Sequence, residues 1–471
     1  MNKLALSKFI LLLTDWLVFG GSLFLALYLL SFSGSIESYF PVSQLDNYIL
    51  IHFSMALVCV AWFWIRLRHY TYRKPFWFEL KEVLRTLVIF FVIELSVIAL
   101  SKLYVSRKLW ILTWVILFVL LPLVRVLLKK TLIAIEWYKR DTVIIGSGKN
   151  AKEVYRALSD ESYLGLNLCY FVSSDNMPVD DLQGMNVIDS KNNDIISFLN
   201  LDKEKTQFIL ALDDEQSLDI WLRYLAKNKC HSVSVIPSVR GIPLYGTDMS
   251  FLFSHEMLLL RVNNNLAKRS SRILKQTMDI IGSIAIITLL SPLLLYLYFA
   301  VKKDGGNAIY GHPRIGRNGK TFKCLKFRSM VVNSKEVLEE LLKNDPEARA
   351  EWGKDFKLKN DPRITKIGHF IRKTSLDELP QLFNVLKGEM SLVGPRPIVK
   401  DELERYEEDV DYYLMAKPGM TGLWQVSGRN DVDYDIRVYY DSWYVKNWSL
   451  WNDIAILFKT VNVVLKRDGA Y

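Results

Sequence analysis

Long runs of apolar residues open the chain and predict membrane-spanning helices. Four such runs occur before residue 130: Leu6–Phe32, Tyr48–Ile65, Leu84–Leu100 and Leu109–Leu128. Each is near the roughly 20 residues that a helix needs to cross the hydrocarbon layer of a bilayer. The first run is not followed by a small-residue cleavage site, so we expect a retained helix. Residues 1–135 are therefore predicted to form a four-helix transmembrane bundle.

Charged residues in and around these runs indicate how the bundle is oriented. The 33–47 segment contains no Lys or Arg, whereas basic residues follow the second and fourth runs, which places both ends of the bundle in the cytoplasm. The 101–108 loop opposes this with three basic residues but is outnumbered. Asp15, Glu94 and Arg125 lie within or beside the apolar runs, where they either pair with one another or mark a function. We favour a packing role.

The pattern changes after Asp141, and residues 136–250 are predicted to form a Rossmann-like α/β domain. A buried strand, a Gly-rich turn and a helix follow one another, and Gly146, Gly148 and Ala151 give the spacing GxGxxA of a nucleotide-binding fingerprint. The acidic residue expected about 20 positions later is not clearly placed, because Asp175 comes late. Two interpretations stay open: a bound nucleotide or sugar nucleotide, and a domain that is vestigial or regulatory.

A fifth apolar run, 279–300, follows a linker at 251–278 and is interrupted by Ser291 and Pro292. Basic residues flank it on both sides, so both of its ends favour the cytoplasm. A proline in the middle of a helix removes one backbone hydrogen bond and kinks the axis. We therefore predict a re-entrant membrane helix that bends at these two residues. The alternative is an ordinary kinked helix that spans the membrane.

Residues 301–471 are predicted to form an α+β domain in the cytoplasm. A hairpin with Gly-rich turns presents basic residues, among them Lys326 and Arg328. Helical apolar spacing at 450–465 predicts a last helix, which packs on the domain core or lies on the membrane surface. Asp453 lies off the apolar face of that helix and is a candidate supporting residue.

An acidic pair, Asp377 and Glu378, lies between Arg372 and Arg396 and forms the candidate catalytic centre. A guanidinium matches phosphate oxygens, and a carboxylate either binds Mg²⁺ or attacks phosphorus. This pattern suggests a site for a phosphorylated substrate and a metal ion. The structural alternative is a capping box at Ser375 and Glu378. Pro380 disfavours it, because in a helix capped by Ser375 this proline would be the fifth helical residue, where its ring opposes the carbonyl of Leu376.

Composition points to a membrane protein with soluble parts. Hydrophobic residues make up 51% of the chain, and the net charge of +10 is concentrated beside the apolar runs. That distribution fits anionic lipid headgroups and phosphorylated substrates better than a nucleic acid. The four cysteines show no CxxC spacing, and the six histidines form no zinc pattern.

Four motifs resemble the bacterial polyprenyl-phosphate sugar-1-phosphate transferases, or monotopic phosphoglycosyl transferases. They are KFRSM at 326–330, RKTSLDELPQL at 372–382, SLVGPRP at 391–397 and KPGMTGLWQVSGR at 417–429. The resemblance covers about 268–471, and the whole chain resembles the long form of this family. It implies transfer of a hexose-1-phosphate from a UDP-sugar to undecaprenyl phosphate at the bacterial inner membrane, at the start of O-antigen, capsule or exopolysaccharide synthesis. Galactose is the expected sugar and glucose the alternative.

The resemblance also assigns roles to single residues. Asp377 matches the aspartate that forms a covalent phosphosugar intermediate, and Glu378 beside it is expected to hold Mg²⁺ with Asp377 as its neighbour in the metal site. Arg372 and Arg396 match phosphate-binding residues, which Lys326 and Arg328 are expected to join. Ser291 and Pro292 match the break of the family's re-entrant helix.

Two other functions fit the sequence less well. A membrane-anchored sugar-nucleotide dehydratase or epimerase requires a Tyr-x-x-x-Lys pair, which 141–250 lacks. A scaffold or chain-length regulator does not need the acidic and basic motifs. The large bundle and the extra domain make a homodimer a plausible partner state.

Overall fold

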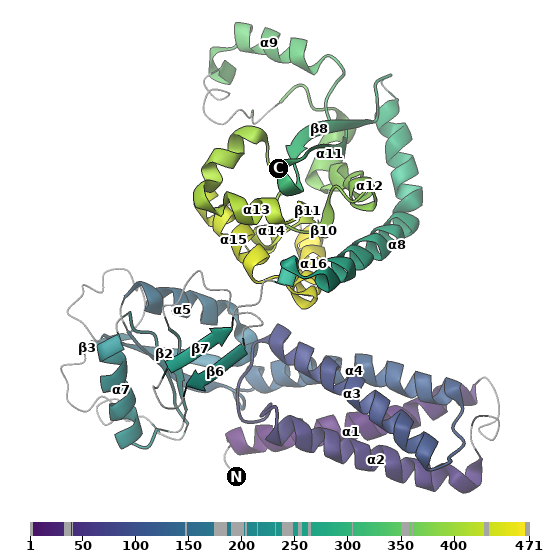
Figure 1. The fold of residues 1–471 in the computed structure, drawn as a ribbon, viewed down its shortest axis with the longest axis vertical. Helices are drawn as coiled ribbons and strands as arrows, with labels where there is room; N and C mark the ends of the chain where they lie inside the picture. The colour runs from purple at the N-terminus through teal and green to yellow at the C-terminus, as the bar shows by residue number, and fades with distance from the viewer. Residues whose placement is uncertain are drawn as a thin grey trace. The chain divides into compact units, whose positions relative to one another are not determined.

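A computed structural model divides the chain into two units, residues 1–239 and 240–471, whose elements are drawn in Figure 1. It describes residues 3–32, 39, 41–146, 148–173, 186–189, 202, 205–213, 215–230, 232–237, 248–252, 257–261, 265–303, 305–349, 358, 361–427 and 433–466. Asp175, the late candidate for the acidic residue of the nucleotide fingerprint, lies outside these residues.

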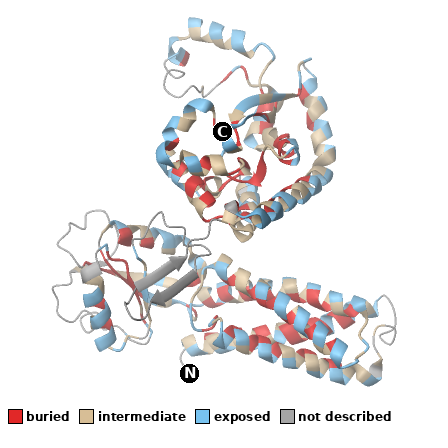
Figure 2. Cartoon of the chain, viewed as in Figure 1, coloured by how far each residue is buried: buried red, intermediate tan, exposed pale blue. Residues whose placement is uncertain are grey.

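The first unit begins with four long helices at the positions of the predicted apolar runs. They are α1 (Lys3–Ser31), α2 (Val42–Ile65), α3 (Phe76–Leu100) and α4 (Arg107–Ala134). Each is long and apolar enough to cross a bilayer, as is one further helix in the second unit. Figure 2 shows buried positions along the facing sides of these helices and exposed ones outside. Large apolar side chains such as Phe9, Leu57 and Val119 are among the exposed residues, as expected where the surrounding solvent is lipid.

The charges inside this bundle are paired, which confirms the expected packing role. Arg125 forms an ion pair with Asp15 and a second one with Glu79, at 3.2 Å from Nη1 to Oε1. Glu94 accepts from Trp114 Nε1 at 2.7 Å and lies 2.8 Å from Nδ1 of His52. Each charge therefore has a polar partner on another helix, which is the arrangement that makes a buried charge tolerable in a membrane.

Among its described residues, the rest of the first unit contains a parallel five-stranded sheet. Its strands are β1 (Arg140–Ile145), β2 (Leu166–Ser173), β3 (Asn186–Asp189), β4 (Gln207–Leu210) and β5 (Val233–Val235), in the spatial order β3-β2-β1-β4-β5. The helices are α5 (Lys149–Asp160) and α7 (Glu215–Lys227), with a short turn η2 (Ser162–Leu164). β1 is central and its last four residues are buried, so the Gly-rich turn after it lies at the carboxyl edge of the sheet.

The second unit combines short strands with many short helices. Its hairpins are β6 (Asp248–Leu252) with β7 (Met257–Arg261), and β8 (Ile309–Ile315) with β9 (Thr321–Phe327) around the turn η5 (Arg317–Gly319). A parallel pair is formed by β10 (Ser391–Val393) and β11 (Gly419–Thr421). The helices are η4 (Asn265–Ala267), α8 (Arg269–Lys302), α9 (Ser334–Asn344), α11 (Lys366–Lys373), η6 (Leu376–Glu378), α12 (Gln381–Leu386), η7 (Lys400–Asp409), α13 (Val410–Met415), α14 (Leu423–Ser427), α15 (Tyr434–Lys446) and α16 (Leu450–Lys466).

The segment 251–278, predicted to be a linker, contains regular structure. It includes the end of β6, the strand β7 and the first ten residues of α8. The sequence analysis missed the hairpin because the five residues of β7, Met257–Arg261, form a short apolar run, which periodicity alone does not assign to a strand.

Helix α8 is continuous through Pro292, and the hydroxyl of Ser291 compensates for the missing backbone donor. Proline at 292 cannot donate to the carbonyl of Thr288, four residues earlier. Ser291 Oγ donates to that same carbonyl at 2.9 Å. The two residues therefore act together, because the hydroxyl satisfies the carbonyl that the proline leaves free. Figure 1 shows α8 curving along one side of the second unit.

Both ends of α8 are fixed to the same folded body. Near its start, Lys275 Nζ donates to Asp453 Oδ2 of α16 at 2.7 Å, and Asp279 accepts from the backbone N–H of Leu392 at 3.1 Å. Near its end, Leu297 and Val301 are buried in a cluster with residues of β9 and α11. The outer side of the helix is apolar and exposed, with Leu289 79% and Phe299 67% accessible.

Candidate active site

The acidic pair lies on a single turn of 3-10 helix between two short α-helices. Helix α11 is capped at its start by Thr365, whose Oγ1 accepts from the backbone N–H of Gly368 at 2.9 Å. The chain then reverses at Ser375, which adopts the left-handed region at φ 55° and makes no capping bond. The capping box is therefore absent, and Pro380 is the N-cap of α12 rather than an interior residue of one longer helix. Left-handed non-glycine residues are uncommon and concentrate at functional sites.

Lys326, on β9, contacts both acids of the pair. Its Nζ donates to Oε1 of Glu378 at 2.7 Å and lies 3.7 Å from Oδ2 of Asp377. Burial alone would lower the pKa of Lys326, but the charges of Glu378 and Asp377 raise it above its ordinary value. The ammonium therefore stays charged and offsets part of the repulsion between the two carboxylates.

Asp377 is the more shielded acid, with a side chain 16% exposed against 36% for Glu378. Burial raises the pKa of Asp377 to about 6, and the charge of Glu378 adds to the effect, while Lys326 and Arg372 oppose it. A carboxylate that has lost part of its hydration is a stronger nucleophile toward phosphorus than a fully solvated one. The two acids therefore differ in exposure, and Asp377 is the one whose pKa burial raises.

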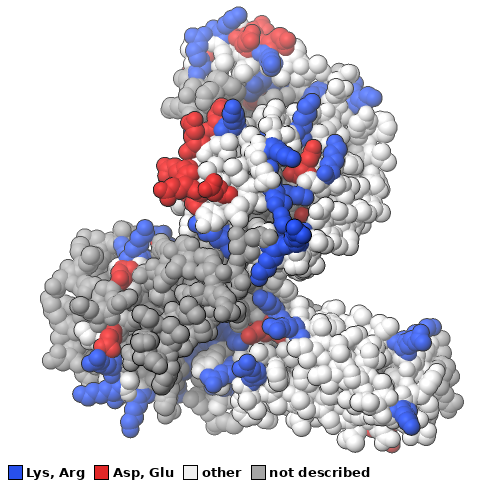
Figure 3. All heavy atoms as spheres, viewed as in Figure 1, with Lys and Arg blue, Asp and Glu red and all other residues white. Residues whose placement is uncertain are grey.

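The predicted basic residues fall into two groups. Arg396 lines one pocket together with Lys326 and Glu378, and its guanidinium carbon lies 5.4 Å from the centre of the Trp424 ring. Arg372 acts electrostatically on Asp377 and donates from Nε to Ser329 Oγ at 2.8 Å. Figure 3 shows basic side chains gathered on one face of this unit around a smaller acidic patch.

Arg328 and Asp453 lie elsewhere. Arg328 donates to three main-chain carbonyls, those of Asn307 at 2.9 Å, Met330 at 2.9 Å and Val301 at 3.1 Å, so in this structure it joins α8 to the hairpin. Asp453 is fully buried, and its carboxylate accepts from Lys275, Tyr444 and Trp448. Its surroundings are those of a residue that holds helices together.

Close backbone packing of two motifs positions Arg396. The strands β10 and β11 pair Ser391 with Gly419 and Val393 with Thr421. A Cβ atom on Gly394 would collide with the carbonyl of Lys417, and one on Gly419 would collide with the backbone nitrogen of Gly394. The glycines of SLVGPRP and KPGMTG are therefore required because two main chains meet there.

Asp441 is a residue of this site that the sequence analysis did not single out. It is 2% exposed, and its Oδ2 accepts from the hydroxyl of Tyr406 at 2.8 Å and from the backbone N–H of Arg396 at 3.4 Å. Its Oδ1 has no partner within the described residues. Burial raises the pKa of Asp441 to about 7, although the hydrogen bonds and the charge of Arg396 act to lower it. No motif marks it, because it lies on α15 and reaches Arg396 only through the fold.

The raised pKa of Asp441 predicts a pH-dependent stability. An unfolded Asp titrates near pH 4, so between about pH 4 and 7 the folded protein holds a proton that the unfolded chain lacks, and stability falls as pH rises. Asp441→Asn keeps the accepting oxygen without the charge. We expect it to melt at a higher temperature than the wild type at pH 8 and at a similar temperature at pH 5. Asp435→Asn, an exposed change on the same helix, serves as the control; equal shifts at both pH values would contradict the prediction.

Comparisons with known proteins identify relatives that extend over both units. Residues 270–467 match the family described as "Bacterial sugar transferase". The chain is 66% identical to an "uncharacterized sugar transferase" of Haemophilus influenzae, with 100% of both chains covered. It is 60% identical to the UDP-galactose-lipid carrier transferase of Erwinia amylovora, covering 98% of this chain and 97% of that one. It is 58% identical to the undecaprenyl-phosphate galactose phosphotransferase of Salmonella typhimurium, covering 99% and 98%.

Proposed function

The chain belongs to the bacterial sugar transferase family, and on that premise we propose that it transfers galactose-1-phosphate from UDP-galactose to undecaprenyl phosphate and releases UMP. The observation that carries this proposal is the meeting of Asp377, Glu378 and Lys326 beside the pocket that Arg396 lines. The names of two relatives that match almost the full length support galactose, and glucose is the alternative.

The reaction proceeds in two displacements at one phosphorus atom. An oxygen of Asp377 attacks the sugar-linked phosphorus of the donor, the bond to the bridging oxygen breaks, and UMP leaves with that oxygen. An oxygen of undecaprenyl phosphate then attacks the same phosphorus, and the Asp377 carboxylate is released. Lys326 and Arg396 offset the charge of the phosphate oxygens, because phosphoryl transfer requires mainly positioning and charge neutralisation.

Mg²⁺ is part of the proposal, with Glu378 and Asp377 as the residues that would hold it. Within the described residues there is no cluster of three or more His, Cys, Asp or Glu side chains that would enclose a metal ion. Two adjacent carboxylates nevertheless suit Mg²⁺, which is commonly bound by one or two carboxylates together with substrate phosphates. When bound, the ion neutralises charge on the transferring group.

An assay of UMP release tests both the substrate and the metal. Purified protein with undecaprenyl phosphate should release UMP from UDP-galactose faster than from UDP-glucose, and release should stop in EDTA. Glu378→Gln should raise the Mg²⁺ concentration needed for half-maximal rate at least about tenfold, because one charged ligand is lost. Glu389→Gln, which changes another Glu of the same unit, is the control. Faster turnover of UDP-glucose would mean that glucose is the transferred sugar, and full activity in EDTA would contradict the proposed role of Mg²⁺.

A re-entrant α8 and a cytoplasmic active site complete the proposal. A helix of 34 residues is about 50 Å long, which is enough to cross a bilayer. The two ends of α8 nevertheless pack on one folded body, through Lys275 at the start and Val301 at the end. A helix that crossed the membrane would need that body on both sides. A bend within one leaflet keeps both ends at the cytoplasmic face of the inner membrane, where UDP-sugars are found.

Labelling of single cysteines tests this topology. Lys303→Cys and Asp160→Cys, each in a cysteine-free background, should be protected from an impermeant maleimide applied to intact cells. Ser101→Cys, in the predicted periplasmic loop between α3 and α4, should be labelled and serves as the positive control. Labelling at Lys303→Cys but not at Asp160→Cys would mean that α8 spans the membrane.

The α/β part of the first unit has the strand order expected for a Rossmann-like domain. A Cβ on Gly148 would collide with the Asp213 carboxylate, so a negative charge of the chain itself lies beside the start of α5, where a phosphate would bind. This favours the vestigial or regulatory interpretation over a bound nucleotide. The interpretation would be overturned if an Asp377→Asn variant bound UDP-galactose tightly and if a further change at Gly148 abolished that binding.

A homodimer is a separate proposal. A mass of one chain, measured for the protein in nanodiscs, would contradict it.

A further inference from the structure

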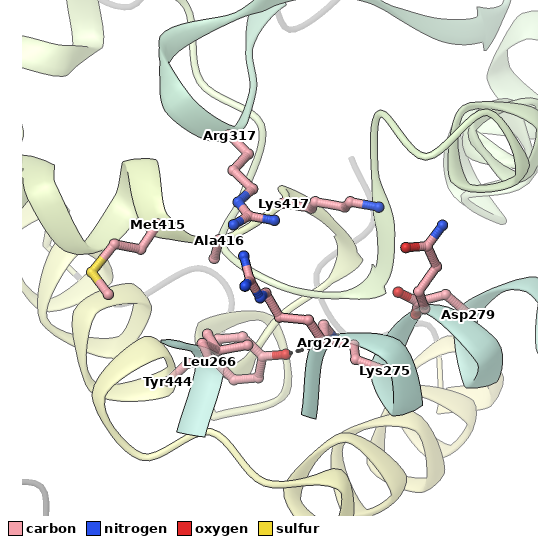
Figure 4. Close-up of a pocket in the computed structure, with 10 residues that line it drawn as sticks. Leu266, Arg272, Lys275, Asp279, Arg317, Met415, Ala416, Lys417 and Tyr444 are labelled. Carbon is pink, nitrogen blue, oxygen red and sulfur yellow. Dashed lines mark hydrogen bonds between the residues drawn. The ribbon is translucent and has the colours of Figure 1, made fainter. Parts of the chain in front are cut away.

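Three basic residues from distant parts of the second unit line a pocket beside the start of α8. Arg272 comes from the first turns of α8, Arg317 from the turn between β8 and β9, and Lys417 from the segment before β11. Figure 4 shows the guanidinium groups of Arg272 and Arg317 pointing toward one another, while the side chain of Lys417 extends away from them toward the side of the pocket that Asp279 lines. Leu266, Met415 and Tyr444 supply less polar walls.

The part of the chain that the structure describes gives these cations no counter-ion. Within the described residues no ion pair involves Arg272, Arg317 or Lys417, and Nε of Arg317 is buried without a hydrogen-bond partner. Lys275, which also lines the pocket, is already paired with Asp453 at 2.7 Å. Asp279 is the acid that remains, so three unpaired cations face one carboxylate. The surplus of two positive charges matches a phosphate monoester, which carries close to two negative charges at neutral pH.

Electrostatics supports this assignment. Burial lowers the pKa of Lys417, and the neighbouring charges of Arg317 and Lys275 lower it further, while Asp279 opposes them. Like charges held together in a partly buried pocket destabilise one another, and a bound dianion would relieve that repulsion. The main chain of Lys417 packs closely against Gly394, so the point from which this side chain extends is fixed.

The pocket is separate from the acidic pair. Arg317 lies in the hairpin turn, whereas Lys326 follows Thr321 by five positions along β9, which is about 17 Å in a strand. A phosphate bound at Arg317 would therefore not contact Asp377. Arg272 precedes the apolar run 279–300 of α8 by seven residues, or about 10 Å, which is within reach of the headgroup layer.

We propose that Arg272, Arg317 and Lys417 form an accessory site for a phosphate monoester carried by a membrane lipid. The inference concerns binding alone and does not depend on the transfer reaction. The same chemistry exists on a free nucleoside monophosphate, but the position of the pocket beside the apolar helix favours the lipid.

Protection of Lys417 from acetylation tests the site in the wild-type full chain. The probes are short-chain phosphatidic acid as the lipid monoester, short-chain phosphatidylglycerol as the diester, and UMP as the soluble monoester. Phosphatidic acid should slow acetylation of Lys417 at least fivefold. The acetylation rate of Lys320, an exposed residue directly after the turn that carries Arg317, should not change. Protection by UMP but not by phosphatidic acid would contradict the proposal that the ligand is a lipid. Equal protection by phosphatidylglycerol would contradict the proposal that the site selects a phosphate monoester. Absence of protection by every probe would overturn the site.

A binding measurement with variants provides an independent readout. Arg317→Gln combined with Lys417→Gln should weaken the binding of phosphatidic acid at least tenfold, whereas Lys320→Gln combined with Lys323→Gln should not change it. Arg317→Lys should retain most of the affinity, because the charge is kept. Wild-type affinity in the first double variant would refute the proposal, and the acetylation result stands even where that variant folds poorly.

Discussion

Replacing Asp377 with asparagine is expected to lower UMP release by at least about 10³-fold without unfolding the protein. The amide is close in size to the carboxylate but has no anionic oxygen to attack phosphorus, and losing a nucleophile generally costs several orders of magnitude. Asp377 lies on a short turn where its strongest contacts are electrostatic ones with Lys326 and Glu378, so the neutral side chain relieves repulsion rather than breaking a packed core. The measurement is initial-rate UMP release, together with the apparent melting temperature.

The matched control is Asp401→Asn, which changes an exposed acid at the start of η7. It should keep the wild-type rate. A second readout follows the sugar: wild-type protein given labelled donor without acceptor should become labelled, and the Asp377→Asn variant should not. A variant that melts normally and turns over at the wild-type rate would remove Asp377 from the role of nucleophile.

The sequence predicted the membrane helices well because lipid solvation leaves a direct mark on composition. The helices of the bundle are longer than the apolar runs, and α3 begins at Phe76 rather than Leu84. The apolar run missed these first turns because they carry charged residues, Glu79 among them. Glu79 is buried in the bundle and is neutralised by Arg125 and Lys129 on α4. A charge reduces the apolar signal of a sequence, and whether it is paired across helices depends on packing that a single segment does not reveal.

At the candidate site, the sequence analysis named residues that lie within one motif. It missed relationships that are set by contacts between distant parts of the chain. Lys326 and Arg328 are two positions apart, so a strand would present both on one face. β9 ends at Phe327, however, and Arg328 turns to the carbonyls of Asn307, Met330 and Val301. Asp441 escaped notice for the converse reason, because its link to Arg396 spans 45 positions of the chain.

Asp453 shows how a predicted supporting residue acquires a concrete role. It lies on α16 and accepts from Lys275 of α8 at 2.7 Å, from Tyr444 of α15 at 2.7 Å and from the indole of Trp448 at 3.0 Å. Lys275 also donates to the carbonyl of Val393, which ends β10, and the hydroxyl oxygen of Tyr444 lies 3.0 Å from the same carbonyl. One carboxylate therefore connects the membrane helix to the strand that precedes Arg396.

Removing that carboxylate is the second change with a large expected effect. Asp453→Ala leaves the buried ammonium of Lys275 without its counter-ion, and breaking a buried pair in this way typically costs about 3–5 kcal/mol. We expect backbone hydrogen exchange in α8, α15 and α16 to speed up by about 10²-fold or more, with no change in α1–α4. Since 1.4 kcal/mol corresponds to a factor of ten, this is the lower end of the expected range.

A second variant separates the loss of the pair from the loss of an unpaired partner. Lys275→Met combined with Asp453→Leu should recover much of the protection, because well-packed apolar replacements of a buried pair are often neutral or stabilising. Asp409→Ala breaks the half-exposed pair with Lys446, at 3.3 Å, and should change exchange by less than about tenfold. An equally small effect of Asp453→Ala and Asp409→Ala on exchange would mean that the buried pair does not attach α8 to the rest of the unit. The attachment would then come from the apolar contacts of Ile286 and Ile287 with the core around Leu382 and Leu392.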